Sequence, residues 1–273
     1  MIKNKFGGIM ATMENKIRKL ISEGKPTVNT RIWSTWPTVL EGAASTGNFD
    51  YFEFLAEYAP FTFPELENFV RACELHNCGS MIKVDYQNRF YIAQKALGMG
   101  FQAILFTDHQ NADQVRETLY NISPESPKYG GRFGYPNARW LGYNPEPKQM
   151  EYADMNASAV KAFMIEKKEA VENIEEICSV PGVDMVQFGP SDYCMSQGWN
   201  CCDHKKEIAE AEEHVIQVAL AHGVQPRCEI YTVEQAEKYK NLGVKHFCIG
   251  DQFDILKDYW INVGGAMRKF ANQ

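Results

Sequence analysis

Two acidic residues stand at the ends of two consecutive apolar runs in this sequence. Glu166 ends the run Ala-Phe-Met-Ile-Glu, and Asp192 ends Phe-Gly-Pro-Ser-Asp. Each run predicts a buried strand, and the segment between them has helical character, so the three form one β-α-β unit. Neighbouring parallel strands lie about 4.8 Å apart, so carboxylates at their ends can reach one hard cation. The pair therefore predicts a divalent metal site.

The whole chain alternates between strand-like and helix-like segments. Strand candidates, eight in number, cover residues 27–33, 51–55, 80–84, 103–106, 161–166, 184–188, 225–230 and 245–250. Helical periodicity follows each of them, at residues 35–45, 64–76, 89–97, 112–121, 169–180, 205–222, 233–242 and 253–270. This alternation requires parallel pairing, and eight repeats predict an α/β fold closed into a (β/α)8 TIM barrel. A doubly wound open sheet is the alternative, disfavoured because no Gly-x-Gly-x-x-Gly turn follows the first strand.

Two segments stand outside this repeat. Residues 13–23 predict an amphipathic helix, which makes residues 1–25 a helical extension that closes the bottom of the fold or packs on a partner. Residues 123–156 are rich in Pro, Gly, Tyr and Asn, which is typical of a lid near the active site or of an oligomer contact. We expect residues 1–273 to form a single barrel domain.

Composition narrows the class of protein. The net charge of −7 and the pI near 5.5 give no basic surface for nucleic acid or for an anionic membrane, so an anionic substrate would need local positive groups. No run approaches 18 apolar residues, and the N-terminal residues are too broken to form a secretion signal. The eight cysteines lack the spacing of a zinc site, and we expect reduced thiols in a cytoplasmic protein.

The predicted strand ends define the candidate active face. Catalytic residues of a (β/α)8 barrel collect at the carboxyl ends of its strands. Those ends supply Trp33, Glu57, Tyr58, Lys83, Asp85, Asp108, His109, Glu166, Asp192, Arg227, Glu229 and Asp251. Arg227 and Glu229 are expected to pair with one another. Contact with solvent alone explains many single charged residues at strand ends, so the functional prediction rests on residues that occur together in a pattern.

Several motifs occur in the order seen in one protein family. They are Phe-Asp-Tyr at 49–51, Glu-Tyr-Ala-Pro at 57–60, Gln-Asn-Ala-Asp at 110–113, Gly-Gly-Arg-Phe-Gly at 130–134, Ile-Glu-Lys-Lys-Glu-Ala at 165–170, Val-Pro-Gly-Val-Asp at 180–184 and Phe-Gly-Pro-Ser-Asp at 188–192. Over nearly its whole length the chain thereby resembles the HpcH/HpaI family of metal-dependent class II pyruvate aldolases and citrate lyase beta subunits.

The resemblance implies a barrel of the phosphoenolpyruvate/pyruvate type that binds Mg²⁺, Mn²⁺ or Co²⁺ through Glu166 and Asp192. Waters and a bound 2-oxo acid would complete the shell, and chelation by the acid would stabilise an enolate. The resemblance also implies a substrate carboxylate held by backbone N–H groups at Ser191 and Asp192, a close approach permitted by Gly189, and a pocket wall at Trp33. A homo-oligomer, such as a hexamer, is implied as well.

The sequence departs from this family at three places. Where the family has Asp-Gly-Glu-His, this chain reads Leu-Ala-Glu-Tyr, so Tyr58 replaces the histidine that transfers a proton. Lys83 replaces an arginine that polarises the keto oxygen, and gives a point charge where arginine gives a planar fork. Met164 replaces a glutamine. We therefore expect Lys83 to polarise the keto oxygen and either Tyr58 or His109 to move the proton.

Each of these roles has a simpler structural alternative. Tyr58 could be a packed aromatic side chain, and His109 a core residue. Arg132 in the Gly-Gly-Arg-Phe-Gly loop could close over the substrate or make an oligomer contact. Glu166 could pair with a nearby Lys or Arg, and Asp192 could cap the helix that follows it.

The sequence as a whole predicts a metal-dependent carbon-carbon lyase, an aldolase. Its expected substrate is a 4-hydroxy-2-oxo acid, cleaved to pyruvate or a similar 2-oxo acid and an aldehyde. Two alternatives remain. One keeps the fold and the metal with another enolate reaction, such as decarboxylation, hydrolysis or a Claisen-type condensation. The other is a non-catalytic ligand-binding or assembly protein on an aldolase scaffold.

Overall fold

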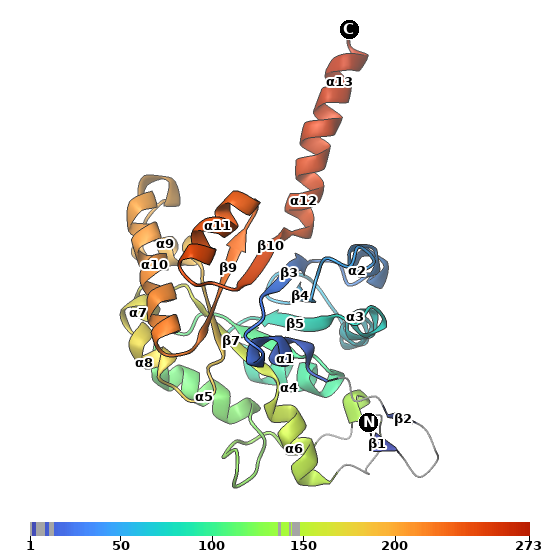
Figure 1. Ribbon diagram of the computed structural model, residues 1–273, viewed down its shortest axis with the longest axis vertical. Coiled ribbons are helices and arrows are strands. Elements are labelled where there is room, and N and C mark those ends of the chain that lie inside the picture. Colours follow the sequence, from blue (N-terminus) through green and yellow to red (C-terminus); the bar gives the residue numbers. More distant parts are fainter. Residues whose placement is uncertain (1, 4–8, 11–13, 136–137, 142, 144–147) are drawn as a thin grey trace.

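Eight parallel strands close into a barrel (Figure 1). The computed structural model describes residues 2–3, 9–10, 14–135, 138–141, 143 and 148–273. The strand order around the barrel is β10-β3-β4-β5-β6-β7-β8-β9, which confirms the predicted (β/α)8 architecture. The barrel strands are β3 (Thr27–Ile32), β4 (Tyr51–Leu55), β5 (Gly79–Val84), β6 (Ala103–Phe106), β7 (Val160–Ile165), β8 (Met185–Phe188), β9 (Gln225–Ile230) and β10 (His246–Asp251).

Helices follow the barrel strands and lie outside them. They are α2 (Pro37–Ala44), α3 (Phe63–Leu75), α4 (Arg89–Met99), α5 (Ala112–Ile122), α7 (Lys168–Glu172), α8 (Ile174–Cys178), α9 (Pro190–Gln197), α10 (Lys205–Ala221), α11 (Val233–Asn241), α12 (Gln252–Tyr259) and α13 (Gly265–Ala271). Helix α1 (Lys16–Ser22) and the short pair β1 (Ile2–Lys3) and β2 (Ile9–Met10) precede the barrel. No helix in the described part of the chain is long and apolar enough to cross a membrane.

The structure differs from the predicted elements at three places. The helix expected at 169–180 is divided into α7 and α8 at Asn173. Helix α9 lies outside the predicted helical segments, because its Gly-Pro-Ser-Asp start has the composition of a turn, and it begins before Asp192. The segment 123–156 carries helix α6 (Gln149–Ala157) and the 3₁₀ turn η1 (Arg139–Leu141), so it is not one long loop.

Helix α1 closes the amino-terminal end of the barrel. Ile17 is fully buried against Tyr51 and Met81, which lie on the barrel strands. The side chain of Asn15 fixes the start of the helix, since its Oδ1 accepts from the N–H of Arg18 at 2.9 Å and its Nδ2 donates to the carbonyl of Gln102 at 2.8 Å. This end of the barrel is therefore plugged, and a ligand must enter from the other end.

A buried arginine occupies the barrel axis. Arg227 on β9 forms an ion pair with Glu53 on β4, and both side chains are at most 1% exposed. The guanidinium also donates to Gln187 on β8, and to Asn29 at 3.1 Å. The expected pairing of Arg227 with Glu229 is wrong, because Glu229 lies one inward position higher on β9 and pairs with Arg31 on β3 instead.

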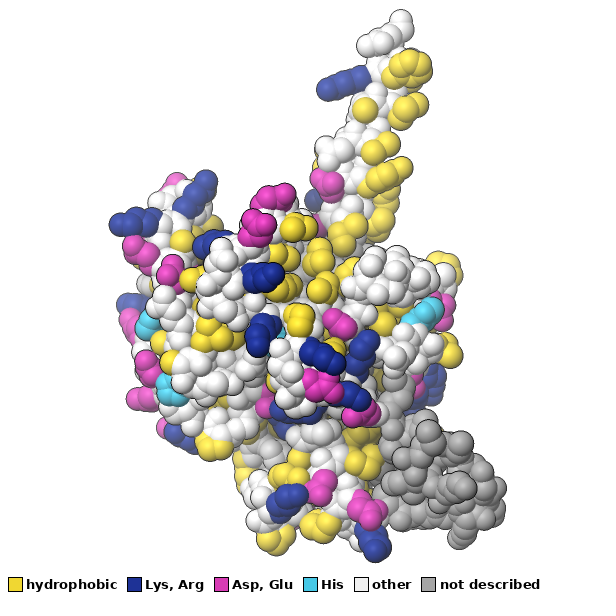
Figure 2. Space-filling model, in the orientation of Figure 1, with side chains coloured by type: hydrophobic (Ala, Val, Ile, Leu, Met, Phe, Trp, Pro, Cys, Tyr) yellow, Lys and Arg dark blue, Asp and Glu magenta, His cyan; other side chains and the backbone are white. Residues whose placement is uncertain are grey.

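The C-terminal helical segment leaves the barrel. Helix α12 continues through the π-helical turn η3 (Trp260–Gly264) into α13, and together they project away from the body of the molecule (Figure 1). Apolar side chains run along this projection (Figure 2). They recur every three or four residues and are all exposed: Phe253, Leu256, Trp260, Val263, Met267 and Phe270.

His109 is a core residue of the fold. It is fully buried, its ring packs on Phe163 with centroids 5.1 Å apart, and one ring nitrogen lies 2.7 Å from the hydroxyl of Thr118. The other ring nitrogen lies 2.8 Å from the carbonyl oxygen of Thr107. Burial, assisted by the nearby charge of Arg89, lowers the pKa of His109 to about 4, so the ring is neutral at pH 7.

We expect Arg227→Met to destabilise the fold strongly. The substitution leaves the carboxylate of Glu53 buried without its counter-charge, which costs roughly 3–5 kcal/mol of unfolding free energy. Urea unfolding followed by circular dichroism measures this loss. The matched control is Arg116→Met, which removes an exposed pair with Asp113 worth about 1 kcal/mol or less. Equal losses in the two variants would contradict the structural role of Arg227.

The buried neutral His109 predicts a loss of stability on acidification. Its pKa is lower in the folded state than in the unfolded state, so between about pH 6.5 and 4 only the unfolded chain takes up this proton. Stability is therefore full above pH 6.5, and this residue removes about 2 kcal/mol of it between pH 7 and pH 5. Urea titrations should show a shallower pH dependence in His109→Gln. The exposed control His214→Gln should keep the wild-type slope, and identical slopes in all three proteins would refute the assignment.

Candidate active site

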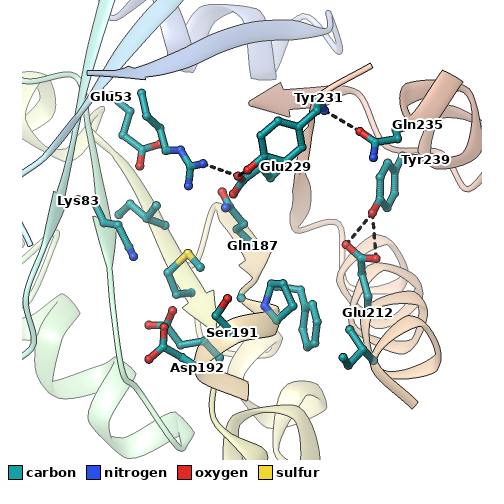
Figure 3. A pocket seen from close by; sticks show the side chains of 18 of the residues that line it. Glu53, Lys83, Gln187, Ser191, Asp192, Glu212, Glu229, Tyr231, Gln235 and Tyr239 are labelled. Carbon is teal, nitrogen blue, oxygen red and sulfur yellow. Dashed lines mark hydrogen bonds and ion pairs between the residues drawn. The ribbon is translucent and has the colours of Figure 1, made fainter. Parts of the chain in front are cut away.

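A cavity of about 390 Å³ opens at the carboxyl ends of the barrel strands (Figure 3). Six residues that the sequence predicts to bind the metal or substrate or to move the proton line it: Tyr58, Lys83, Glu166, Gly189, Ser191 and Asp192. They come from the ends of β4, β5, β7 and β8 and from the first turn of α9. The barrel therefore brings together side chains that are far apart in the sequence.

Glu166 directly follows β7 and is 2% exposed. Its Oε1 accepts a hydrogen bond of 2.9 Å from the backbone N–H of Asp108. Burial raises the pKa of Glu166 to about 7, although the positive charge of Lys83 opposes this rise. None of the ion pairs found in the described ranges includes Glu166, so the expected alternative of a structural salt bridge is not met.

The N–H group that holds Glu166 comes from a strained position. Asp108 has φ of 60°, a left-handed conformation that few residues other than glycine adopt. Such conformations persist where the surrounding structure fixes them, often at functional sites. The side chain of Asp108 accepts from Lys167 Nζ at 2.6 Å. The backbone of Asp108 thus holds Glu166, and its side chain holds Lys167, which also lies near Asp192.

Gly189 allows the loop after β8 to lie against Glu166. A Cβ atom at this position would lie 2.7 Å from Glu166 Cβ, which is closer than real Cβ atoms approach, and Glu166 Cβ is fixed by the backbone. The chain then enters α9 at Pro190, so Ser191 and Asp192 lie in the first helical turn. Gly189 is itself the N-cap residue, and the alternative that Asp192 caps this helix is therefore wrong.

The two carboxylates suit a divalent cation. The charge of Asp192 contributes to the raised pKa of Glu166, which indicates that the groups are close enough to repel each other. Hard carboxylate oxygens are the ligands that Mg²⁺ and Mn²⁺ prefer. Within the described ranges no group of three or more His, Cys, Asp or Glu side chains could hold an ion. Glu166 and Asp192 would therefore share a cation with oxygen atoms of water or substrate.

A second cluster lies beside this carboxylate pair. Lys83 on β5 forms an ion pair with Glu57, and its Nζ donates to the hydroxyl of Tyr58 at 3.1 Å. Burial favours the neutral amine, but the charges of Glu166 and Glu57 outweigh it and raise the pKa of Lys83. Burial also raises the pKa of Tyr58, against the effect of Lys83. At neutral pH the cluster is therefore an ammonium group beside a protonated phenol.

Three further residues that the sequence predicts for binding or proton transfer do not line the cavity. Trp33 stacks on Tyr58 with ring centroids 5.7 Å apart and so lies behind it. His109 lies within the core, where both ring nitrogens have partners. Arg132 is exposed, and its N–H donates to the carbonyl of Tyr120 at the end of α5. The described residues that connect α5 to β7 lie at the amino-terminal end of the barrel (Figure 1), opposite to the carboxylate pair.

The cavity also contains residues that the sequence did not single out. Glu53 and Gln187 form its floor, where each contacts Arg227. A charged residue inside an otherwise apolar strand is the signal that could have revealed Glu53. Glu212 on α10 and Tyr239 on α11 line the outer part. Nothing in their local sequence distinguishes them from other polar residues on covering helices.

Comparisons with known proteins agree with this geometry. The sequence model of the HpcH/HpaI aldolase/citrate lyase family matches residues 56–248. Over 239 residues the chain is 26% identical to the 4-hydroxy-2-oxo-heptane-1,7-dioate aldolase of Escherichia coli, which covers 87% of this chain and 89% of that relative.

Two solved structures have the same fold. The HpcH/HpaI aldolase from Desulfitobacterium hafniense superposes with a TM-score of 0.82 at 24% identity, over 92% of this chain and 96% of that chain. The citrate synthase SbnG superposes with a TM-score of 0.84 at 20% identity, over 95% and 100% of the two chains. The family match covers most of the chain, and the family is named for an aldolase and a citrate lyase, so the alternative of a non-catalytic scaffold is set aside. This chain belongs to the HpcH/HpaI aldolase/citrate lyase family and is an enzyme of the lyase class.

Proposed function

We propose that the protein is a divalent-metal-dependent aldolase that cleaves a 4-hydroxy-2-oxo acid to pyruvate, or a similar 2-oxo acid, and an aldehyde. The observation that carries this proposal is the placement of Glu166, Asp192 and Lys83 around one cavity at the active end of the barrel. The name of the Escherichia coli relative, a 4-hydroxy-2-oxo-heptane-1,7-dioate aldolase, supports the same class of substrate.

Glu166 and Asp192 would hold the cation, which when bound would withdraw charge from the keto oxygen of the substrate. Lys83 lies beside them as a buried ammonium group, which favours negative charge on the same oxygen. The first turn of α9 presents Ser191 at the positive end of the helix, where a substrate carboxylate is favoured. These groups would orient the 2-oxo acid before any bond breaks.

Cleavage requires one proton to move from the C4 hydroxyl to C3. The bond between C3 and C4 breaks, its electron pair passes into the enolate of pyruvate, and the aldehyde carbonyl forms at C4. Tyr58 carries its proton at neutral pH and would donate it to C3, with the phenolate stabilised by Lys83 Nζ at 3.1 Å. Water accepts the proton that the C4 hydroxyl loses as the bond breaks, and the Tyr58 phenolate later regains a proton from water, since Tyr58 is 51% exposed. The buried His109 has no part in this proposal.

The compartment is a further part of the proposal. All eight cysteines are free thiols, and unpaired cysteines are typical of proteins kept in a reducing environment. This supports a cytoplasmic location.

We propose further that the protein is a homo-oligomer whose C-terminal helices dock on a second copy of the chain. The exposed apolar residues of α12, η3 and α13 follow the three-and-four spacing of a helix that packs on another helix. Phe247 and Ile249 on β10 are only half-buried, and none of the nine residues of α11 is buried. The barrel surface from which the helix departs is thus also uncovered. A contiguous apolar face of this kind marks a protein interface. A second copy of the chain would supply a barrel surface for the helices of the first copy, and helices to cover its barrel surface.

Exchange of the pyruvate methyl protons tests the proposed chemistry. With Mn²⁺ and pyruvate in D₂O, we expect the wild-type protein to exchange these protons and to condense pyruvate with an aldehyde. Glu166→Gln should lower both rates by roughly a hundredfold or more, because it removes a ligand of the charge-stabilising cation. Proton NMR measures the exchange, and calorimetry measures Mn²⁺ binding.

The matched control is Glu169→Gln, an exposed acid three residues later on α7, which should behave as the wild type. Exchange without aldol product would favour another enolate reaction on the same site. Mn²⁺ affinity and exchange that are unchanged in Glu166→Gln would refute the metal assignment.

The oligomer prediction is tested with a double variant on the projecting helix. Trp260→Glu combined with Val263→Glu places charges in the apolar face, and we expect it to convert the assembly into 31.1 kDa monomers because a buried charge is unfavourable at an interface. Light scattering coupled to size-exclusion chromatography measures the mass. Lys257→Glu, an exposed polar position on the same helix, is the control. A wild-type protein that is already monomeric would contradict the proposal.

A further inference from the structure

The active-site cavity continues beyond the barrel axis. Its inner part is lined by Lys83, Glu166 and Asp192, and its outer part by Glu212 of α10 and Tyr239 of α11. Figure 3 shows Lys83 and Asp192 on one side of the cavity and Glu212 and Tyr239 on the other, with Gln187 of β8 and Glu229 of β9 between them. A ligand held at the carboxylate pair can therefore extend sideways toward the covering helices.

The barrel wall is open at this point because β8 and β9 separate. Over the described strands, β8 pairs with β9 at Met185 with Gln225 and at Val186 with Pro226, and no further. By contrast, β9 stays paired with β10 up to Ile230. Pro226 has no N–H group to donate to the ladder. The carboxyl halves of the two strands are thus free to stand apart around the cavity.

Strand β9 keeps its place despite this short ladder. Arg227, the next residue after Pro226, donates to Gln187 across the gap and pairs with Glu53 across the barrel. These side-chain contacts replace the missing backbone bonds at the level of the cavity floor. The opening is therefore a fixed part of the fold and not a frayed edge.

The outer part of the cavity is rich in hydrogen-bond acceptors. Tyr239 donates to both carboxylate oxygens of Glu212, at 3.0 and 2.9 Å, and Tyr231 donates to Glu229 at 2.6 Å. Each carboxylate oxygen can accept about two hydrogen bonds, so acceptor capacity remains at both acids. A ligand that satisfies this part of the cavity must supply donors.

Charge excludes an anionic ligand group from the same place. Arg31 is one of the positively charged side chains that line the cavity, and it is already paired with Glu229. Over the described residues, no Lys or Arg lies within ion-pair distance of Glu212. The carboxylate of Glu212 accepts its hydrogen bonds from the neutral hydroxyl of Tyr239. The charge of Lys238 on α11 acts on Glu212, but Lys238 is not among the residues that line the cavity. A second carboxylate on the ligand would therefore face Glu212 with no cation paired to either group, which is unfavourable in a partly enclosed site.

The remaining donors are hydroxyl and ammonium groups. An aldehyde that carries a primary amine condenses to an imine, either within one molecule or between two molecules, so it is a poor partner for an aldolase. Hydroxyl groups are stable beside an aldehyde, and a pair of them matches the two oxygens of a carboxylate. Hydroxyl groups are therefore the donors that we expect on the aldehyde.

We propose that the space between β8 and β9 is the acceptor subsite, in which Glu212 and Tyr239 select an uncharged, hydroxylated aldehyde. This inference rests on the proposed aldolase function and names its acceptor class. Glu212 binds the hydroxyl groups of the aldehyde, while the 2-oxo acid stays at the inner carboxylate pair. The selecting residues lie on the covering helices α10 and α11, away from the groups that move the proton.

Competing aldehydes test the acceptor subsite. With saturating pyruvate and Mn²⁺, we compare kcat/KM for glyceraldehyde, for propanal, which lacks its two hydroxyl groups, and for succinic semialdehyde, which carries a carboxylate. We expect glyceraldehyde to exceed propanal by about tenfold or more, because a site built to bind hydroxyl groups rejects an analogue without them. Succinic semialdehyde should be the poorest substrate.

Glu212→Met should bring glyceraldehyde and propanal to within about threefold of each other, since it removes the acceptor. Glu212→Gln keeps an acceptor oxygen but no charge, so it should gain activity on succinic semialdehyde while retaining a preference for glyceraldehyde. The control is Glu213→Met, an exposed neighbour on α10 that should keep all three values. Exchange of the pyruvate methyl protons should be unchanged in these variants, which shows that each has folded and keeps its inner site.

Two failures are distinguishable in this experiment. If the wild-type protein exchanges the methyl protons but uses glyceraldehyde and propanal equally, the acceptor subsite is wrong and the aldolase proposal stands. The same conclusion follows if Glu212→Met and Glu213→Met have the same selectivity. A wild-type protein that shows neither exchange nor condensation overturns both proposals.

Discussion

The buried charge of Arg227 is the constraint on which the rest of the barrel depends. A guanidinium on the axis is tolerable only with a counter-charge and full hydrogen bonding, and Glu53, Gln187 and Asn29 supply these from three other strands. The same contacts hold β9 where its backbone pairing with β8 ends. The barrel can therefore open sideways without losing its shape. The buried polar cluster around Arg227 thus forms the floor of the cavity, through Glu53 and Gln187.

Burial acts in opposite ways on the two groups above this floor. It raises the pKa of Glu166 to about 7 by penalising its negative charge, whereas Lys83 keeps its proton because Glu166 and Glu57 surround it. A divalent cation would stabilise the ionised carboxylate of Glu166, and Lys83 would remain a fixed positive charge beside it. In our proposal the carboxylate pair is therefore the part of the site whose charge a cation balances, whereas the charge of Lys83 is balanced by Glu166 and Glu57.

Much of this arrangement could be predicted from the sequence because it follows from periodicity. Strand and helix alternation predicted the barrel, and the ends of consecutive strands predicted that Glu166 and Asp192 lie together. The same reasoning did not place His109 and Arg132. Asp108 turns the chain with φ of 60°, which carries His109 from the strand end into the core. Arg132 follows a helix, and in this fold the connection from a helix to the next strand lies at the opposite end of the barrel.

Pairs that form between separate elements could not be predicted in this way. Arg227 and Glu229 lie two residues apart on one strand, so their side chains point to the same side at different heights, and each finds a partner on another strand. Glu212 and Tyr239 meet only because α10 and α11 pack over the separated ends of β8 and β9. In our proposal the acceptor is chosen there, whereas the cation and the proton are handled at the strand ends. Because these two sets of residues belong to different elements, substitutions on the covering helices can change the acceptor without disturbing the carboxylate pair.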